Sequence, residues 1–166
     1  MSFMVSVLLV ALVPFTFVFP QAPRARAEDF RGLAGARWTG TLVYLDYGRN
    51  KEVSIPSNLT VTQSPEDPAA WVFEYEYPDE PKANGKRAVT LGGGGATVDG
   101  GAVVERTSLD GGALRIVAER RGKDNDRDAL LRYTYLIGRS SFSIRKEVRP
   151  EGASEFFERN RYSWER

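Results

Sequence analysis

The stretch Trp71-Val72-Phe73-Glu74-Tyr75-Glu76-Tyr77 alternates large aromatic residues with polar or smaller ones. Successive side chains of a β-strand point to opposite faces, so the four aromatic residues share one face while Val72, Glu74 and Glu76 share the other. A helix would distribute the same residues around its axis. The stretch therefore predicts a β-strand with one buried and one solvated face.

The chain on both sides of this stretch follows the same pattern. From Trp38 onward, no segment keeps apolar residues at the helical spacing for long enough to predict a helix. Extended segments alternate instead with residues that favour turns. We expect strands near Trp38–Tyr47, Val53–Thr62, Trp71–Tyr77, Arg87–Leu91, Ala102–Ser108, Ala113–Arg121, Leu130–Ile137, Ser141–Arg149 and Phe156–Trp164.

The breaks between the expected strands are short, as in Gly48-Arg49-Asn50 and Asp110-Gly111-Gly112, and favour hairpins. Strands that follow one another should therefore be neighbours in the sheet. We expect an all-β fold, a single antiparallel up-and-down β-barrel of eight or nine strands, because closure removes both unpaired edges. A β-sandwich is the alternative. Asp29–Ala36 should form a short helical turn at one barrel end, with Asp29 as its N-cap.

The amino-terminal segment resembles a secretory signal. Met4–Phe19 is a nearly unbroken apolar run, and Ala25-Arg26-Ala27 follows it. At about 16 residues, the run is shorter than the roughly 20 that a membrane-spanning helix needs. The two alanines match the A-x-A pattern of a cleavage site. We therefore expect residues 1–27 to be a signal peptide and residues 28–166 to be one exported domain, periplasmic or secreted, without stable membrane insertion; a retained membrane anchor is the alternative.

Composition excludes several classes of function. The 166 residues are 42% hydrophobic and 27% charged, which is enough apolar residue for a folded core. The formal net charge is +1, so nothing favours nucleic acid as a partner. The chain has no cysteine and no histidine, which excludes disulfides, thiolate or histidine catalysis and the usual transition-metal ligands. We expect no metal, no cofactor and no enzymatic activity, although chemistry based on Glu, Tyr or Arg stays open.

Two short motifs imitate ligand sites. Gly92-Gly93-Gly94-Gly95 lacks the Gly-Lys-Ser/Thr that completes a phosphate loop, so we interpret it as a flexible loop or a barrel bend. Asp124-Asn125-Asp126-Arg127-Asp128 has the carboxylate spacing of a calcium loop. However, Ala129 stands where that loop needs glycine and Tyr135 stands where it needs glutamate. This motif is interpreted as a solvated hairpin.

The two ends of the chain carry a family resemblance. Leu33-Ala34-Gly35-Ala36-Arg37-Trp38-Thr39-Gly40 places a glycine and a tryptophan at the entry to the first strand, and the last segment of the chain is Arg159-Asn160-Arg161-Tyr162-Ser163-Trp164-Glu165-Arg166. Both segments resemble those of lipocalin-like barrels of the calycin superfamily, in which an arginine of the last strand packs over the tryptophan. The resemblance implies that Arg159 or Arg161 covers a buried Trp38. It also implies a cup for a small, largely apolar molecule.

The inward faces of the barrel supply the candidate ligand site. Tyrosine is informative there, because a buried hydroxyl needs a partner, which can be a ligand. We expect the site to be lined by Tyr44, Phe73, Tyr75, Tyr133, Tyr135 and Phe142, with Arg132 or Arg145 near the mouth for an anionic group. The predicted function is binding of a small apolar or amphipathic molecule inside the barrel. The alternative is an envelope structural or interaction protein whose barrel is packed and holds no ligand.

The exported protein should begin at or near Glu28, because the apolar run is short and the A-x-A pattern ends at Ala27. Amino-terminal sequencing of exported material measures this directly. Recovery of chains that still start at Met1 from the membrane fraction would contradict the prediction.

Overall fold

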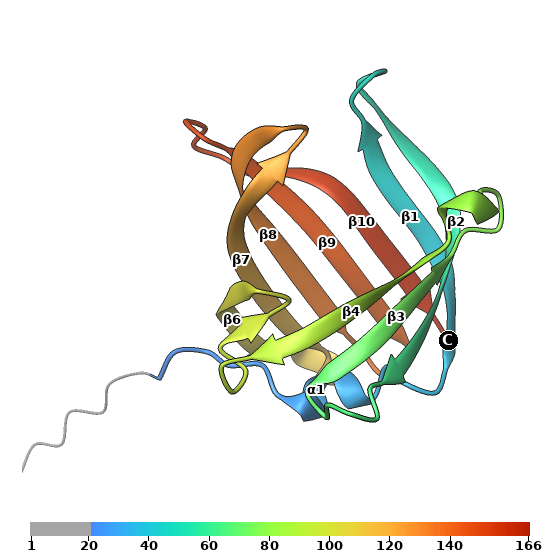
Figure 1. The fold of residues 1–166 in the computed structure, drawn as a ribbon, viewed down its shortest axis with the longest axis vertical. Helices are drawn as coiled ribbons and strands as arrows, with labels where there is room; N and C mark the ends of the chain where they lie inside the picture. The colour runs from blue at the N-terminus through green and yellow to red at the C-terminus, as the bar shows by residue number, and fades with distance from the viewer. Residues whose placement is uncertain (1–20) are drawn as a thin grey trace, which may run out of the picture.

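The computed structural model describes residues 21–166, whose strands form one closed antiparallel β-barrel (Figure 1). Within these residues there are ten strands and one α-helix. They are α1 (Ala27–Arg31), β1 (Arg37–Asp46), β2 (Lys51–Gln63), β3 (Ala70–Glu76), β4 (Gly85–Gly92), β5 (Thr97–Val98), β6 (Gly101–Ser108), β7 (Leu114–Asp124), β8 (Arg127–Ile137), β9 (Ser141–Pro150) and β10 (Phe157–Glu165). The expected up-and-down barrel is confirmed, and the sandwich alternative is not.

Every strand pairs with its neighbours in the sequence, and β10 pairs with β1 to close the sheet. The closing register joins Gly40 to Trp164 and Tyr44 to Asn160. Gly40 is required there, because a Cβ at this position would overlap the carbonyl group of Ser163. The structure has one strand more than the nine that we expected, namely β5. The sequence did not indicate it, because it has only two residues and follows the glycine-rich loop that we expected at Gly92–Gly95.

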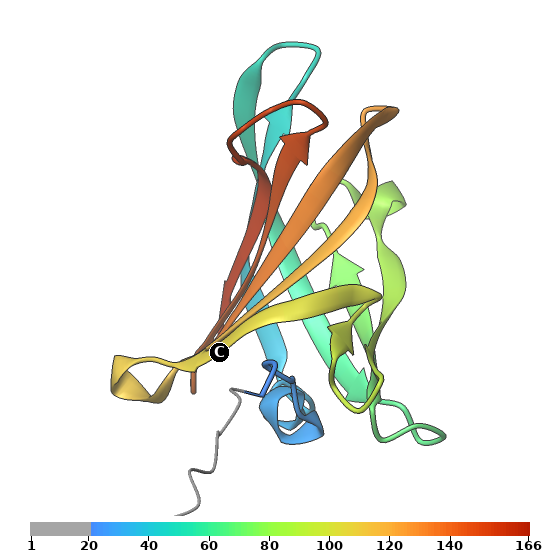
Figure 2. The same cartoon turned by 90° about the vertical axis from the view of Figure 1, so that its left-hand side faces the viewer.

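Helix α1 lies at one end of the barrel (Figures 1 and 2). An aromatic core fills this end. Phe30 of α1 packs 5.3 Å from Trp71 and 5.7 Å from Tyr135, between ring centroids. The same core contains other fully buried aromatic side chains, namely Trp38, Phe73, Phe142 and Trp164. Burying side chains of this size is the main source of stability in the fold.

Helix α1 is held to the barrel by an ion pair. Both carboxylate oxygens of Asp29 accept hydrogen bonds from the Arg106 guanidinium, at 2.6 and 2.8 Å. The helix spans Ala27–Arg31 and is preceded by Arg26, whose backbone N–H donates to Asp29 at 2.8 Å. The expected helical turn is therefore present but begins two residues earlier, and Asp29 lies inside the first turn rather than at the N-cap.

Trp38 is fully buried at this closed end, and its indole N–H donates to the carbonyl of Leu33 at 2.9 Å. The arginine that covers it is Arg166, whose guanidinium carbon lies 4.5 Å from the Trp38 ring. Our prediction named Arg161 or Arg159 instead, which was wrong. Trp164 points inward, so Arg161 three positions earlier points outward, and Arg159 contacts the other end of the barrel.

The predicted signal peptide lies mostly outside the described residues, which begin at residue 21. Its last residues contact the barrel. Arg24 donates to the carbonyl of Gly93 at 2.7 Å, and the backbone N–H of Ala25 donates to Gly95 at 2.9 Å. Ala25 is only 3% exposed, so cleavage before Glu28 would remove a buried residue. Among residues 21–166, no helix has the length and apolarity to span a membrane.

Replacement of Trp38 should weaken the whole barrel, since the ring occupies the closed end. We expect Trp38→Ala to lower the free energy of unfolding by about 3–5 kcal/mol in urea titrations. Arg166→Ala should lower the free energy of unfolding more than the matched control Arg161→Ala does. Arg161 forms only an exposed ion pair on the outer face. A loss below about 1 kcal/mol for Trp38→Ala would show that this end does not depend on the ring.

Candidate functional site

A cavity of about 290 Å³ lies inside the barrel in the half away from α1. Four tyrosines from three parts of the wall line it: Tyr75 and Tyr77 at the end of β3, Tyr133 from β8 and Tyr162 from β10. Its other lining residues are Ala83, Gly85, Lys86, Arg87, Ile144, Lys146 and Asn160. The cavity therefore combines aromatic walls with a small number of polar and positively charged groups, which is the usual composition of a small-molecule site.

The aromatic core forms the floor of this cavity. Trp164 stacks on Tyr162 with ring centroids 5.0 Å apart and on Phe142 at 5.4 Å. Tyr75 packs against both Tyr162 and Trp164, at 5.3 and 6.1 Å. The Trp164 indole N–H finds no hydrogen-bond partner among residues 21–166, so ring packing holds the floor in place. A ligand in the cavity would rest on a rigid aromatic surface.

The hydroxyls of Tyr75 and Tyr162, on the cavity wall, stay protonated over the physiological pH range. Tyr77 and Tyr162 share a hydrogen bond of 2.8 Å between their hydroxyl oxygens. Burial raises the pKa of Tyr75 to about 12, although the charge of Arg87 opposes the rise. Burial and the hydrogen bond with Tyr77 raise the pKa of Tyr162 further above its ordinary value. The cavity thus offers neutral O–H groups, which can both donate and accept hydrogen bonds.

Two arginines lie against Tyr133. The guanidinium carbon of Arg120 is 5.6 Å from the ring centroid, and that of Arg87 is 6.0 Å away. Arg120 also donates weakly to the Tyr133 hydroxyl at 3.4 Å. Arg87 forms an ion pair with Asp99, whereas Arg120 has no ion-pair partner in the described part of the chain. Positive charge is therefore concentrated beside one wall of the cavity.

A second polar cluster lies at the rim and is centred on Asp124. Lys146 donates to the Asp124 carboxylate at 2.7 Å, Arg159 approaches it at 3.7 Å, and the Tyr47 hydroxyl donates to its other oxygen. Burial alone would raise the pKa of Asp124. The hydrogen bonds from Lys146 and Tyr47, and the charges of Lys146 and Arg159, outweigh burial and hold that pKa below its ordinary value.

The Asp124 cluster joins the tips of several strands. Its members come from β7, β9, β10 and the turn after β1, and Arg159 belongs to a β-bulge between Glu158 and Asn160. The segment that we interpreted as a solvated hairpin does form the tight β7–β8 turn, where Asn125 and Asp126 have positive φ. The side chain of Asp124 itself is only 8% exposed, so this residue belongs to the interior.

Two of the expected site residues, Tyr75 and Tyr133, line the cavity. Three others lie in the packed core below it. The ring centroids of Phe73 and Phe142 are 6.1 Å apart. Tyr135 packs beside Phe30, and only 1% of its surface is exposed. Tyr44 lies across from Asn160 in the β1–β10 ladder but does not line the cavity. The expected site therefore mixes one layer of cavity residues with one layer of core residues.

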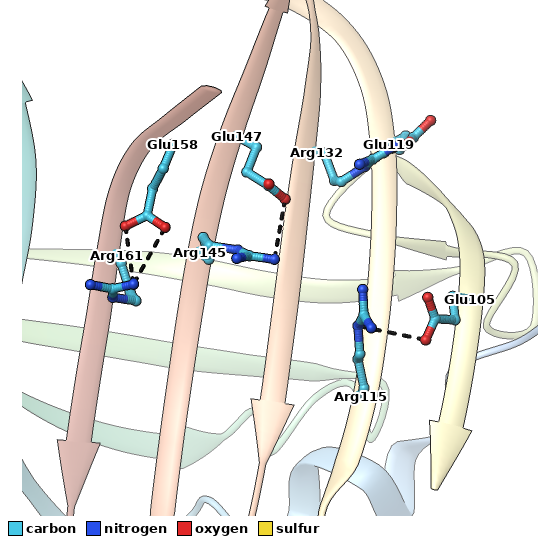
Figure 3. A network of polar contacts seen from close by, with 8 residues as sticks. All are labelled: Glu105, Arg115, Glu119, Arg132, Arg145, Glu147, Glu158 and Arg161. Carbon is cyan, nitrogen blue, oxygen red and sulfur yellow. Dashed lines mark hydrogen bonds and ion pairs between the residues drawn. The ribbon is translucent and has the colours of Figure 1, made fainter. Parts of the chain in front are cut away.

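Arg132 and Arg145 lie on the outer face of the barrel, as Figure 3 shows, and not at the mouth. Arg132 pairs with Glu119 at 2.7 Å, and Arg145 pairs with Glu147 at 3.5 Å. They belong to a ladder of four outer ion pairs that also includes Arg115–Glu105 and Arg161–Glu158. Strand alternation gives the physical reason, because inward Tyr133 and Ile144 force their neighbours outward.

Sequence reasoning missed several residues of the site, among them Tyr77, Arg87, Arg120, Lys146 and Tyr162. Alternation could have found four of them. Lys146 shares a face with Ile144, Tyr162 with Trp164, Tyr77 with Tyr75, and Arg87 with Val89. The proximity of Arg120 to Tyr133 depends on the β7–β8 register, which the sequence leaves open.

The two largest of the other hollows are less suited to a ligand. One, of about 650 Å³, lies at the tips of the β7–β8 and β9–β10 connections, among charged side chains such as Arg121, Lys123 and Glu151. The other, of about 630 Å³, lies along β2, β3 and β4 and is lined mainly by exposed polar residues such as Glu74 and Lys86. Tyr75 is the one aromatic residue among their linings, whereas four tyrosines line the interior cavity.

No protein-family model and no curated protein sequence matches this chain. The structure defines the class of protein on its own: a closed antiparallel β-barrel, compatible with a lipocalin-like fold, with an aromatic cavity at the end away from α1.

The charge of Asp124 should stabilise the barrel in a pH-dependent way. Because its pKa is lowered in the folded protein, the stabilisation is complete above the ordinary carboxylate pKa of about 4 and is lost as the pH falls through the folded value. We expect Asp124→Asn to cost about 1–3 kcal/mol at pH 7 in urea unfolding, and clearly less at pH 3.

The matched control is Asp128→Asn in the same hairpin, whose carboxylate is 68% exposed and lies 4.0 Å from Lys123. This control should change stability by less than about 0.5 kcal/mol at either pH. An Asp124→Asn deficit that stays constant from pH 7 to pH 3 would contradict a role for the carboxylate charge.

Proposed function

We propose that this chain is an exported binding protein that holds a small apolar or amphipathic molecule in the tyrosine-lined cavity. One observation carries the proposal: Tyr75, Tyr77, Tyr133 and Tyr162 surround a cavity of about 290 Å³ inside the barrel. A core that needs only volume would use aliphatic residues, whose burial leaves no hydroxyl to satisfy.

The size of the cavity supports a compact ligand. Ligand pockets have volumes of roughly 300–1,000 Å³, so about 290 Å³ lies at the lower limit of that range. The floor formed by Trp164 and Phe142 separates the cavity from the α1 end. An extended lipid chain would have to displace this floor, whereas a molecule of one or two rings needs no such change.

The lining residues support a ligand that is aromatic or amphipathic. Tyrosine rings offer faces for offset or edge-to-face packing. The hydroxyl pair of Tyr77 and Tyr162, and the Asn160 amide, offer hydrogen bonds that fix orientation. The two ends of the chain resemble those of lipocalin-like barrels, and the cup that this resemblance implies would hold the same kind of small molecule.

A barrel without a ligand is the second candidate, favoured by the solid aromatic packing of the α1 half. In that case the protein would have a structural or interaction role in the cell envelope. The two candidates differ in one measurable property, namely whether the half of the barrel away from α1 accepts a guest molecule.

The proposed function is tested with 2-naphthamide, a neutral two-ring probe, by fluorescence titration and calorimetry. We expect saturable binding, and we expect Tyr133→Ala to weaken it at least tenfold while Tyr44→Ala, a tyrosine outside the cavity lining, leaves it within twofold. Thermal unfolding of each variant confirms that it is folded. Native mass spectrometry of protein purified from its own host should also show a retained small molecule.

Absence of binding by 2-naphthamide and by its carboxylate analogue 2-naphthoate below about 100 μM, which corresponds to about −5.5 kcal/mol, would overturn the proposed function. Equal binding by the wild-type protein and Tyr133→Ala would also overturn it, since the probe would then occupy another site.

A further inference from the structure

Positive charge exceeds negative charge around the cavity, and the proposed function says nothing of the charge of the ligand. Four cationic side chains contact it or its Tyr133 wall: Lys86, Arg87, Arg120 and Lys146. Three acids oppose them, because Glu74 pairs with Lys86, Asp99 pairs with Arg87 and Asp124 pairs with Lys146. Asp124 is also shared with Arg159, so the acids do not balance the cations.

Arg120 carries the unbalanced charge. The described part of the chain gives it no carboxylate partner; its contact is the Tyr133 ring, 5.6 Å from the guanidinium carbon, and the Tyr133 hydroxyl at 3.4 Å. It lies on the inward face of β7, in register with Leu131 of β8, and stays accessible to water. A guanidinium with free donors beside an aromatic wall can bind an oxyanion through charge-assisted hydrogen bonds.

Arg87 lies on the same side of the cavity. It lines the cavity directly, and its guanidinium carbon is 6.0 Å from the same Tyr133 ring. Its charge also opposes the rise in pKa of Tyr75, Tyr135 and Tyr162, which places positive potential at the tyrosine hydroxyls. An anionic group on a ligand would enter this potential, whereas a cationic group would be repelled.

We propose that the cavity selects a compact aromatic anion, whose ring packs among the tyrosines and whose anionic group binds between Arg120 and Arg87. The inference rests on the proposed function and adds the charge and the shape of the ligand. A carboxylate on one or two rings fits both the cavity volume and the two guanidinium groups beside Tyr133.

The test compares 2-naphthoate with 2-naphthamide, which have the same rings and nearly the same shape but differ by one negative charge. We expect 2-naphthoate to bind wild-type protein at least tenfold more tightly at pH 7 and low ionic strength. Added salt should reduce this ratio, because Arg120 is exposed to solvent.

Arg120→Gln should reduce the carboxylate preference to less than threefold while leaving 2-naphthamide binding unchanged. The matched control is Arg132→Gln, which removes an arginine from the outer face of the adjacent strand β8 and should leave the preference intact. Arg87→Gln should also lower the preference, and its thermal unfolding must be measured because Asp99 loses its partner.

Equal affinity of wild-type protein for the two probes would overturn the anion preference while the proposed function stands. A preference that Arg120→Gln and Arg87→Gln both preserve, or that Arg132→Gln abolishes, would overturn the assigned position of the anionic group.

Discussion

Closure of the sheet, through pairing of β10 with β1, is the constraint on which the rest of the structure depends. In a closed barrel every second residue of each strand must share one interior, so the interior volume is finite and each inward side chain affects the others. The chain meets this constraint with aromatic residues at the α1 end, where Arg166 covers Trp38 and Asp29 holds the helix to Arg106. The space that these rings leave is the cavity.

The inward residues form successive layers along neighbouring strands. On β9 the sequence runs from Phe142 through Ile144 to Lys146, and on β10 it runs from Trp164 through Tyr162 to Asn160. The first layer is solid, the second surrounds the cavity, and the third supplies charge and hydrogen bonds at the rim. A ligand that enters from the rim therefore meets polar groups first and aromatic groups last. This order suits an amphipathic molecule better than a purely apolar one.

The sequence predicted the fold well because period-two alternation is a local property. The strand at Trp71–Tyr77 and the hairpins around it already specify an antiparallel meander, and closure follows from the need to remove edges. The site was predicted less well. Tyr75 and Tyr135 have the same alternation pattern, yet one lines the cavity and the other lies in the core, since depth along the barrel axis depends on strand tilt and register. Arg132 and Arg145 are different, because alternation alone excludes them from the interior.

The central claim is that the half of the barrel away from α1 receives a ligand while the α1 half stays packed. A titration of 15N-labelled protein with 2-naphthoate, followed by amide chemical shifts, tests it most directly. We expect the largest shifts at Gly85, Tyr133 and Asn160, which surround the cavity, and no significant shifts at Phe30 or Leu33 beside α1. Shifts confined to α1, or to the outer ladder around Arg132 and Arg145, would contradict the claim.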